Sequence, residues 1–402
     1  MLPRKRAVAR YLFYTTLVFC TLWMWLSLPD DTYTTRDVIR AGSSNISQTT
    51  VRKGGKPTPA ELSHRHSNQS LQSMIKNMTL LKVNHTDIEE IMLKMNSTDK
   101  TVYANPHPFN YILNARNMCK GRDVFLMIYV HTAPSHTKRR MVIRNTWANQ
   151  KYYPSDVVRI IFVMGKTKDK PEVQQALAFE SDTYGDIVQE DFEDTYKNLT
   201  YKGIAALKWI RTYCGHSKFV LKTDDDIFVN MFTLMRHLKS LDRYGVQNTN
   251  LMMCLVWYRM PVMRSGKWKV TEKEWKEKYY PTYCSGSAYT MSTDVAVRMF
   301  NVSLYTPFFW VDDFYITGLL PLKLGIKHKQ FMSTYVLDGR RLEEKFTGPQ
   351  WFTYIFSHVH DLDAIQNVWE RLVQLASGKV RATVKYALAK DLPKDDHKPN
   401  KG

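Results

Sequence analysis

Three consecutive carboxylates stand in the stretch FVLKTDDDIFVN (219–230). Asp224, Asp225 and Asp226 lie between two apolar runs, although adjacent like charges repel and β-strands disfavour aspartate. On an extended backbone Asp224 and Asp226 point to one face and Asp225 to the other. Carboxylate oxygens suit Mg²⁺ or Mn²⁺, and a cation that holds a diphosphate needs few protein ligands. A solvated acidic turn or a helix N-cap is the alternative, which the apolar flanks disfavour.

A second acidic pair, Asp312 and Asp313, lies in FFWVDDFYITG (308–318), again among bulky apolar residues. A carboxylate in such surroundings could act as a general base, because burial and neighbouring charge set its pKa. Equally, Asp312 could cap the start of a buried helix. The residues alone leave both interpretations open.

Other polar groups give weaker signals. His358 and His360 in FSHVHDLDAIQNVW (356–369) would share one face of a strand, as metal ligands or as structural groups. In YPTYCSGSAYTMS (280–292), small residues around Gly286 would let the backbone approach a ligand, or simply make a tight turn. The basic residues of SHTKRR (135–140) and Arg144 could face phosphates, or form a solvated helix face.

The elements that must position these groups alternate along the chain. Hydrophobic runs predict strands at 123–134, 157–165, 186–192 and 218–229, and helical spacing predicts helices at 135–150, 170–185 and 198–214. Such alternation predicts an α/β fold with a mainly parallel sheet. Ligands of these sheets bind at the carboxyl ends of the strands, which is where the three aspartates fall.

The N-terminal residues predict a membrane anchor. A basic stretch, MLPRKRAVAR (1–10), precedes the charge-free run YLFYTTLVFCTLWMWLSL (11–28), which is about the minimum length for a spanning helix. A signal peptide is disfavoured, because the run ends in bulky residues and not in a small-residue cleavage site. The basic flank is expected to stay cytoplasmic, which places the remainder in the lumen. The expected parts are a cytoplasmic tail (1–10), a signal-anchor (11–28), a polar stem (29–118), a catalytic domain (119–370) and a basic tail (371–402).

A lumenal location affects how the net charge, the cysteines and the N-glycosylation sequons are interpreted. The formal net charge of +19 would suggest nucleic acid, but a lumenal domain makes an anionic sugar nucleotide or solubility the better explanation. Of the five cysteines, Cys20 lies in the apolar run, and the other four predict up to two disulfides with the pairing open (Cys119, Cys214, Cys254 and Cys284). Sequons for N-glycosylation occur at Asn45, Asn68, Asn77, Asn84, Asn96, Asn198 and Asn301.

Six stretches, in this order, resemble the inverting β1,3-glycosyltransferases of the animal Golgi (glycosyltransferase family 31), which include β1,3-galactosyltransferases and β1,3-N-acetylglucosaminyltransferases. The matching blocks are the run from Arg140 to Trp147, FVMG (162–165), EDFEDTYKNLTYKG (190–203), KTDDDIFVN (222–230), YPTYCSGSAY (280–289) and VDDFYITG (311–318). The resemblance implies a GT-A fold, a Rossmann-like sheet with a nucleotide-sugar half and an acceptor half. It also implies a Golgi type II membrane enzyme that uses a UDP-sugar and Mn²⁺ or Mg²⁺.

The resemblance also implies roles for individual residues. Asp313 would be the catalytic base, Asp226 and His358 would hold the metal, and Asp224 would lie near the ribose. Asp225 is also predicted to be a donor-binding residue. Strand alternation, however, points its side chain away from the face of Asp224 and Asp226, so it is the aspartate most expected to tolerate replacement by asparagine. The remaining assignments are Arg140, Arg144, Lys202 and Asp194 for the donor site or its scaffold, and Tyr283, Gly286, Trp310 and Asp312 for the donor-sugar or acceptor pocket.

The sequence departs from the family pattern at three places. Ala288 follows Gly286-Ser287 where relatives often have a glycine run, and Phe314 replaces a small aliphatic residue. Asp312 stands where galactosyl members often have Glu, whereas Thr317-Gly318 is similar to N-acetylglucosaminyl members. UDP-galactose is the favoured donor, with UDP-N-acetylglucosamine or UDP-N-acetylgalactosamine as alternatives and a glycan on lipid or protein as acceptor. An inactive lectin-like scaffold is the competing class.

Overall fold

The computed structural model describes residues 103–168, 170–243 and 249–379, all within one compact unit. The predicted anchor at 11–28 lies outside these ranges, as do most of the predicted stem and the end of the basic tail. Among the described helices, none combines the length and the apolar character needed to cross a membrane.

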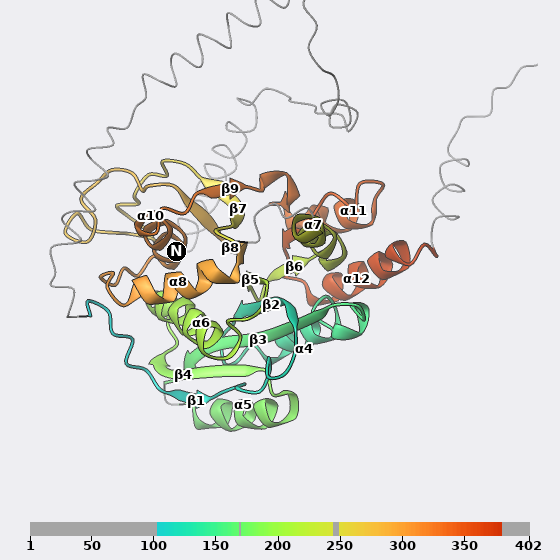
Figure 1. Cartoon of the computed structure of the whole chain (residues 1–402), viewed down its shortest axis with the longest axis horizontal. Helices are drawn as coiled ribbons and strands as arrows, with labels where there is room; N and C mark the ends of the chain where they lie inside the picture. The colour runs from blue at the N-terminus through green and yellow to red at the C-terminus, as the bar shows by residue number, and fades with distance from the viewer. Residues whose placement is uncertain (1–102, 169, 244–248, 380–402) are drawn as a thin grey trace, which may run out of the picture. The chain divides into compact units, whose positions relative to one another are not determined.

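A central sheet runs through the domain in the order β1-β4-β3-β2-β5-β8-β7-β9 (Figure 1). Its strands are β1 (Tyr111–Leu113), β2 (Val124–His131), β3 (Val157–Lys166), β4 (Ile187–Glu193), β5 (Phe219–Asp224), β7 (Met252–Trp257), β8 (Tyr283–Ser292) and β9 (His328–Gln330). The neighbours β4-β3-β2-β5 are parallel, whereas β8 is antiparallel to both β5 and β7. The structure therefore confirms the α/β class and the Rossmann-like half implied by the GT-A resemblance.

Helices cover both faces of this sheet. Described in chain order, they are α4 (Thr137–Asn145), α5 (Pro171–Tyr184), α6 (Leu199–Tyr213), α7 (Met231–Arg243), α8 (Thr293–Ser303), α11 (Leu342–Thr347) and α12 (Leu362–Ala376). Alternate residues of β2 serve two cores: Met127 and Tyr129 face the core of α6 and α8, while Ile128 and Val130 face that of α4, α7 and α12. Every residue of β2 is buried, as expected for a central strand that is covered on both faces.

A smaller sheet stands beside the main one, in the order β10-β11-β6. It contains β6 (Ile227–Val229), β10 (Tyr335–Val336) and β11 (Phe356–His358). The prediction of a single strand over 218–229 was therefore wrong. The chain leaves the main sheet after Asp224, turns at Asp225 and Asp226, and enters the second sheet at Ile227.

The domain boundaries also differ from those predicted. The predicted stem includes residues 103–118, but β1 in this stretch pairs with β4, and the Asn105 N–H donates to the Leu304 carbonyl at 3.0 Å. At the other end, α12 continues past residue 370 to Ala376. The folded domain therefore starts earlier and ends later than the 119–370 segment, because apolar side chains at both ends pack into it: Phe109 and Tyr111 against one core and Leu372 within the other.

Two disulfides join the four cysteines of this domain. Cys119 pairs with Cys214, and Cys254 pairs with Cys284. The first ties the entry to β2 to the end of α6, and the second links the neighbouring strands β7 and β8. The expected number of bridges is confirmed, and the structure resolves the pairing that the sequence left open.

Candidate active site

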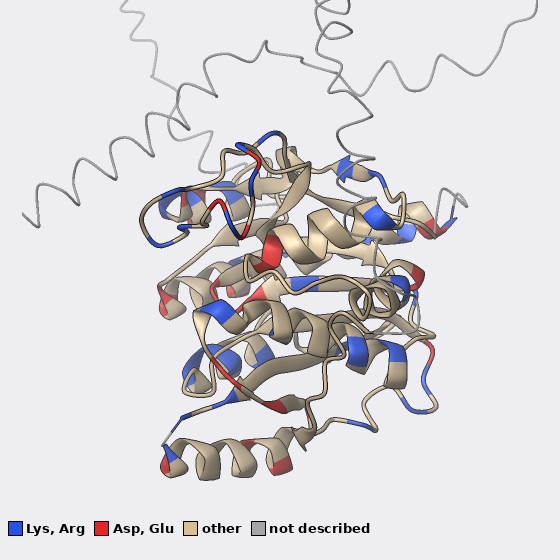
Figure 2. Ribbon diagram, turned by 90° about the vertical axis from the view of Figure 1, so that its left-hand side faces the viewer, with Lys and Arg blue, Asp and Glu red and all other residues tan. Residues whose placement is uncertain are grey.

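The candidate site lies at the edge of the sheet where the parallel strands β2 and β5 end. His131 and Asp224 are paired in register there, and the antiparallel β8 brings Gly286 to the same edge. Ligands of α/β sheets bind at such an edge, as the sequence predicted for the aspartates. In Figure 2, Lys and Arg residues (blue) are spread over helices, strands and loops rather than gathered in one band.

Lys222 connects the end of β5 to β8. Its side chain is almost fully buried, and Nζ lies 2.6 Å from Oδ1 of Asp224 and also donates to the Gly286 carbonyl. Burial raises the pKa of Asp224 to about 6, and the Lys222 charge opposes that rise. A buried cation therefore holds the first carboxylate of the triad in place.

Asp312 and Asp313 begin a helix that changes its pitch near the site. The segment α9 (Asp312–Phe314) leads into a π-helical turn, η3 (Tyr315–Leu319), and then into α10 (Leu320–Lys323). The Phe314 N–H donates to Oδ1 of Asp313 at 2.8 Å. Single π-helical turns inside α-helices are frequent at functional sites. A helix does start here, but its N-cap is Val311 and both aspartates lie in its first turn, so the interpretation of Asp312 as the cap was wrong.

Asp313 has the electrostatics of a general base. Burial raises its pKa to about 7, and the neighbouring charge of Asp312 adds to the rise. Burial also raises the pKa of Asp312, while the Lys222 charge acts in the opposite direction. A carboxylate whose pKa lies near neutrality accepts a proton far better than an ordinary aspartate does.

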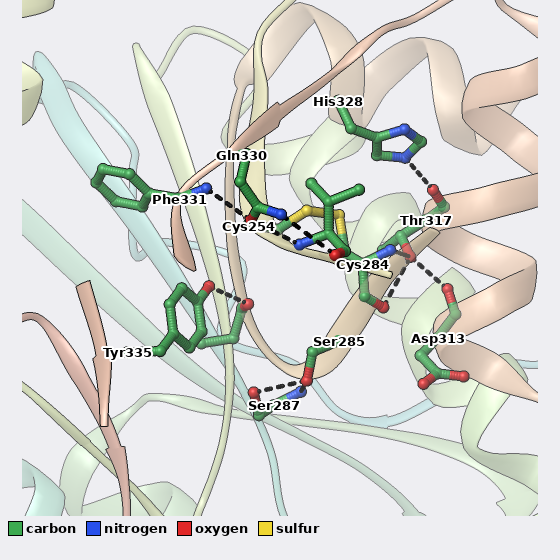
Figure 3. The surroundings of a disulfide bond; sticks show 12 residues. Cys254, Cys284, Ser285, Ser287, Asp313, Thr317, His328, Gln330, Phe331 and Tyr335 are labelled. Carbon is green, nitrogen blue, oxygen red and sulfur yellow. Dashed lines mark hydrogen bonds between the residues drawn. A yellow bond between two sulfur atoms is a disulfide. The ribbon is translucent and has the colours of Figure 1, made fainter. Parts of the chain in front are cut away.

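The backbone of Asp313 is fixed from the side of the second disulfide (Figure 3). The Thr317 hydroxyl donates to the Asp313 carbonyl, and the Cys284 N–H donates to the Thr317 hydroxyl oxygen at 2.9 Å. The Asp313 carboxylate points away from Thr317 in this view. The bridge between Cys254 and Cys284 thus supports β8, against which Asp313 packs, and this support could not be predicted from the residue pattern.

Asp226 and His358, the predicted metal pair, lie on neighbouring segments, with His360 close by. Its carbonyl accepts from the Val359 N–H at 2.7 Å, and β11 pairs with β6 so that His358 is opposite Ile227. Nδ1 of His360 is 4.0 Å from Oδ2 of Asp226, but this side chain is 81% exposed. Burial lowers the pKa of His358, which favours the neutral ring that a metal ligand needs. No group of three or more metal-ligating side chains occurs in the described ranges.

Asp225 points toward a different set of partners. Its Oδ2 accepts from the Thr132 hydroxyl at 2.6 Å and lies 2.7 Å from Nδ1 of His136, while Arg139 Nη1 is 3.7 Å from Oδ1. Burial would raise the pKa of this carboxyl, but the bonds to His136 and Thr132 hold it below its usual value. The expected divergence of Asp225 from Asp224 is thus present, although it arises at a turn and not along a strand.

Arg140 and Arg144 of α4 make ion pairs and hydrogen bonds within the protein. Arg140 is fully buried and donates to Glu180 at 2.7 Å and to the Ala133 carbonyl at 2.7 Å. Arg144 donates to Glu180 at 2.7 Å and to both oxygens of Asp186 at 2.8 Å. Their guanidinium groups are directed at protein acceptors, which favours the scaffold half of the earlier assignment over direct contact with a donor.

Lys202 on α6 also directs its charged group at acceptors within the protein. Nζ donates to the Thr132 carbonyl at 2.8 Å and lies 3.0 Å from Oδ2 of Asp194. The same Oδ2 atom accepts a hydrogen bond from the Gly165 N–H. Thr132 also binds Asp225, so Lys202 braces the end of β2 beside the acidic turn. The structure brings Lys202 and Asp194 together as a supporting pair.

Aromatic residues pack behind Asp313. Phe314 is fully buried, with ring centroids 4.4 Å from Tyr280 and 5.8 Å from Tyr283. Trp310 is also buried, and its Nε1–H donates to Glu274 at 3.1 Å. Phe314 therefore fills an aromatic core, and its replacement of a small aliphatic residue has a packing explanation.

Two of the predicted glycosylation sites fall within the described residues. Asn301 is exposed on α8. Asn198 is half-buried, its amide donates to the Glu193 carbonyl, and Thr200 of the same sequon is buried with its hydroxyl on the Phe309 carbonyl. Asn301 is thus the more accessible of the two. The other five sites, Asn45, Asn68, Asn77, Asn84 and Asn96, lie outside the described residues and stay predictions.

Sequence reasoning missed Lys222, Glu180 and His136. Lys222 had a detectable signal, because a lysine inside an otherwise apolar strand needs a partner when buried. Glu180 and His136 had none, since each meets its partner only through tertiary packing.

Comparisons with known proteins place these features in a family. Residues 138–332 match the galactosyltransferase family model. The human lactosylceramide 1,3-N-acetyl-beta-D-glucosaminyltransferase is 36% identical over 226 residues, which cover 54% of this chain and 59% of the relative. The chain thus spans about three fifths of that relative's length.

Galactosyltransferases match as well. Mouse beta-1,3-galactosyltransferase 1 is 35% identical over 224 residues, 55% of this chain and 67% of the relative. Beta-1,3-galactosyltransferase 2 of Pongo abelii is 28% identical over 351 residues, 83% and 82% of the two chains. A solved structure of the galactosyltransferase LgtC, with 12% identity and a TM-score of 0.31 over 63% of this chain and 96% of that one, is too distant to support an argument. On the strength of the sequence matches, the chain belongs to the galactosyltransferase family that contains the β1,3-galactosyl- and β1,3-N-acetylglucosaminyltransferases.

Proposed function

We propose that the protein transfers a hexose from a UDP-sugar to a hydroxyl of an acceptor glycan, with inversion, to give a β1,3 linkage. The observation that carries this proposal is the half-buried Asp313, whose pKa is raised to about 7 at the edge of the sheet. Asp224 and Lys222 stand at the same edge and connect to Gly286, against which Asp313 packs. Relatives named as β1,3-transferases support the linkage.

The chemistry assigned to the site is a single displacement. The Asp313 carboxylate takes the proton of the acceptor hydroxyl, and that oxygen forms a bond to the anomeric carbon of the donor. The bond from that carbon to the diphosphate breaks, and UDP departs with the electron pair. Attack from the face opposite the leaving group inverts an α-linked donor to a β-linked product, as in inverting glycoside hydrolysis.

Asp226 and His358 are the residues that would hold a divalent cation, Mn²⁺ or Mg²⁺. Their fit rests on the donor set: the Asp226 carboxylate directly precedes β6, and His358, a half-buried imidazole whose pKa is lowered by burial, ends the β11 strand that pairs with β6. Two protein ligands suffice where phosphate oxygens and water complete the shell. When bound, such a cation would neutralise charge on the departing diphosphate.

UDP-galactose remains the favoured donor, with UDP-N-acetylglucosamine and UDP-N-acetylgalactosamine as alternatives. The relatives divide between galactosyl and N-acetylglucosaminyl transfer, so their names support either sugar. The acceptor is proposed to be a glycan on a lipid or a protein, and one relative's name specifies lactosylceramide. The proposed location is the Golgi membrane, with the domain lumenal behind the anchor at 11–28.

A turnover assay with the lumenal fragment 100–402 tests this function. The fragment is incubated with Mn²⁺, the three UDP-sugars in turn and simple acceptor glycosides, and UDP release is measured. We expect acceptor-dependent release with one donor, and NMR of the product should show a β1,3 linkage. UDP binding without release from any donor would instead support the inactive lectin-like scaffold.

A further inference from the structure

An exposed aromatic surface lies near the candidate site, and the sequence pattern predicts no role for its residues. It consists of Tyr196 in η2 (Tyr196–Asn198), which precedes α6, and Lys267 and Trp268 in the long β7–β8 connection. Trp268 Nε1 donates to the Tyr196 hydroxyl at 2.5 Å, and Lys267 Nζ lies 4.2 Å from the centre of the Tyr196 ring. Tyr196 is 43% exposed and Trp268 is 41% exposed. We call these three residues the aromatic rim.

Residues next to the rim contact the segment that leads into the helix carrying Asp313. The Thr200 hydroxyl, one turn after Tyr196, donates to the Phe309 carbonyl at 2.7 Å. Lys197, next to Tyr196, lies with Nζ 5.5 Å from the centre of the Trp310 ring, two residues before Asp312. Burial, together with the charges of Asp312 and Asp313, raises the pKa of Tyr196. These contacts, through the residues next to Tyr196, bring its hydroxyl within electrostatic range of the acidic pair.

The segment that carries Trp268 is braced by its own contacts. The Val270 N–H donates to the Met263 carbonyl at 2.8 Å, and Arg264 donates to the Trp275 carbonyl at 2.8 Å. Glu274 accepts from the Thr271 N–H at 2.8 Å and from Trp310 at 3.1 Å. Trp268 is therefore held in position without being covered, which distinguishes it from a side chain on a free loop.

The chemistry of the rim suits a neutral sugar. Aromatic side chains bury large flat areas and carry a polar edge, and a pyranose ring likewise has an apolar face and polar edges. The one cation of the rim, Lys267, makes cation–π contacts with both the Tyr196 and Trp268 rings, so its charge is not directed at a ligand. Glu274, within the same segment, would also repel an acidic sugar.

We propose that the aromatic rim of Tyr196, Lys267 and Trp268 is the acceptor subsite, which stacks the terminal pyranose of a neutral glycan and presents its hydroxyl to Asp313. This inference rests on the proposed function and specifies the substrate that the same site takes. The exposed ring of Trp268 supplies the stacking face. The Tyr196 hydroxyl accepts from Trp268, so its own proton is left to donate to an oxygen of the sugar.

The test compares full-length wild type with Trp268→Ala and Trp268→Phe in detergent micelles. The probes are methyl β-D-galactopyranoside and methyl β-D-N-acetylglucosaminide as neutral glycosides, and N-acetylneuraminic acid as the acidic one. We expect Trp268→Ala to raise the acceptor KM about tenfold with little change in kcat, because ground-state and transition-state stacking are lost together. Trp268→Phe keeps an aromatic face and should restore most of the loss. UDP affinity, measured in parallel, shows that the variants are folded.

Phe179→Ala is the matched control, because Phe179 is 76% exposed on α5 and has no part in the site. Saturation-transfer NMR reports glycoside binding without turnover, so it separates the two proposals. Binding that depends on Trp268 without turnover of any UDP-sugar would overturn the proposed function and support the subsite. Normal turnover with an acceptor KM within twofold of wild type in Trp268→Ala, or binding of N-acetylneuraminic acid in preference to the neutral probes, would overturn the subsite.

Discussion

Gly286 and Asp313 are packed so closely that a Cβ on residue 286 would lie 3.0 Å from the Asp313 Cβ. Such a contact is tighter than side chains normally accept, so one partner has to move. We predict that Gly286→Ala displaces the carboxylate and lowers kcat by about tenfold or more, since misplacement by about 1 Å can cost a hundredfold in rate. Steady-state kinetics with saturating donor would measure this loss.

Ser285→Ala is the control for that substitution. Ser285 is the preceding residue of β8, and its hydroxyl bonds the Ser287 hydroxyl at 3.0 Å and not Asp313. Its kcat should stay within about twofold of wild type. Equal kcat values for Gly286→Ala and wild type would show that the contact has no role in placing the base.

The pH dependence of turnover should report the protonation of Asp313. Burial raises its pKa to about 7, and only the deprotonated carboxylate can accept the acceptor proton. The rate should therefore fall about tenfold for each pH unit well below 7. Because the Asp312 charge contributes to the rise, Asp312→Asn should move this acidic limb to lower pH. An acidic limb near pH 4 in the wild type would contradict the assignment of Asp313 as the base.

Much of this fold was predictable because its core strands are continuous apolar runs. β2 and β3 appear close to the predicted 123–134 and 157–165, and α6 follows its apolar periodicity. The strand predicted over 218–229 failed for a physical reason. Periodicity cannot show that Ile227-Phe228-Val229 pairs with Phe356-Ser357-His358, more than a hundred residues away, rather than continuing β5.

The candidate site was predictable in its carboxylates and not in its supports. Asp224, Asp226 and Asp313 stand out because charges in apolar surroundings need an explanation. The Lys222 contacts, the Thr317 bond to the Asp313 carbonyl and the pairing of Cys254 with Cys284 depend on how β8 lies against β5 and η3. Such relationships join residues that are far apart in the sequence, so spacing alone gave no access to them.

His358, at the end of β11, and His360, two residues later, can be distinguished as metal ligands. His358 is partly buried and its pKa is lowered by burial, whereas His360 is largely exposed. His358→Gln should weaken Mn²⁺-dependent UDP binding at least tenfold, because a ligand is lost from a site that has few. His360→Gln, the matched control, should leave it within about threefold. Isothermal titration with UDP and Mn²⁺ measures both, and a larger loss for His360→Gln would transfer the assignment to that residue.

Lys222 is expected to control the acidic pair as well as Asp224. Its positive charge opposes the rise in the pKa values of Asp224, Asp312 and Asp313. In Lys222→Met all three pKa values should rise further, and the acidic limb of the pH–rate profile should move up by about one pH unit. A profile that coincides with that of the wild type would mean that Lys222 only fills space between β5 and β8.

Glu180 separates a scaffold role for the arginines of α4 from a donor-binding role. Glu180→Gln would leave Arg140, which is fully buried, without its carboxylate partner, while Arg144 would keep Asp186. Breaking a buried ion pair from one side costs about 3–5 kcal/mol of unfolding free energy. We therefore expect a clear loss of stability in urea denaturation.

The fraction of the Glu180→Gln protein that stays folded should have a donor KM close to that of the wild type, because Glu180 makes no contact with the acidic turn of Asp224, Asp225 and Asp226. Glu172→Gln is the matched control, since Glu172 is exposed in the first turn of the same helix α5 and should change stability by less than about 0.5 kcal/mol. A stable Glu180→Gln protein with a donor KM raised tenfold would return Arg140 and Arg144 to direct donor binding. Loss of stability with an unchanged KM assigns both arginines to holding α4 against α5 beneath the end of β2.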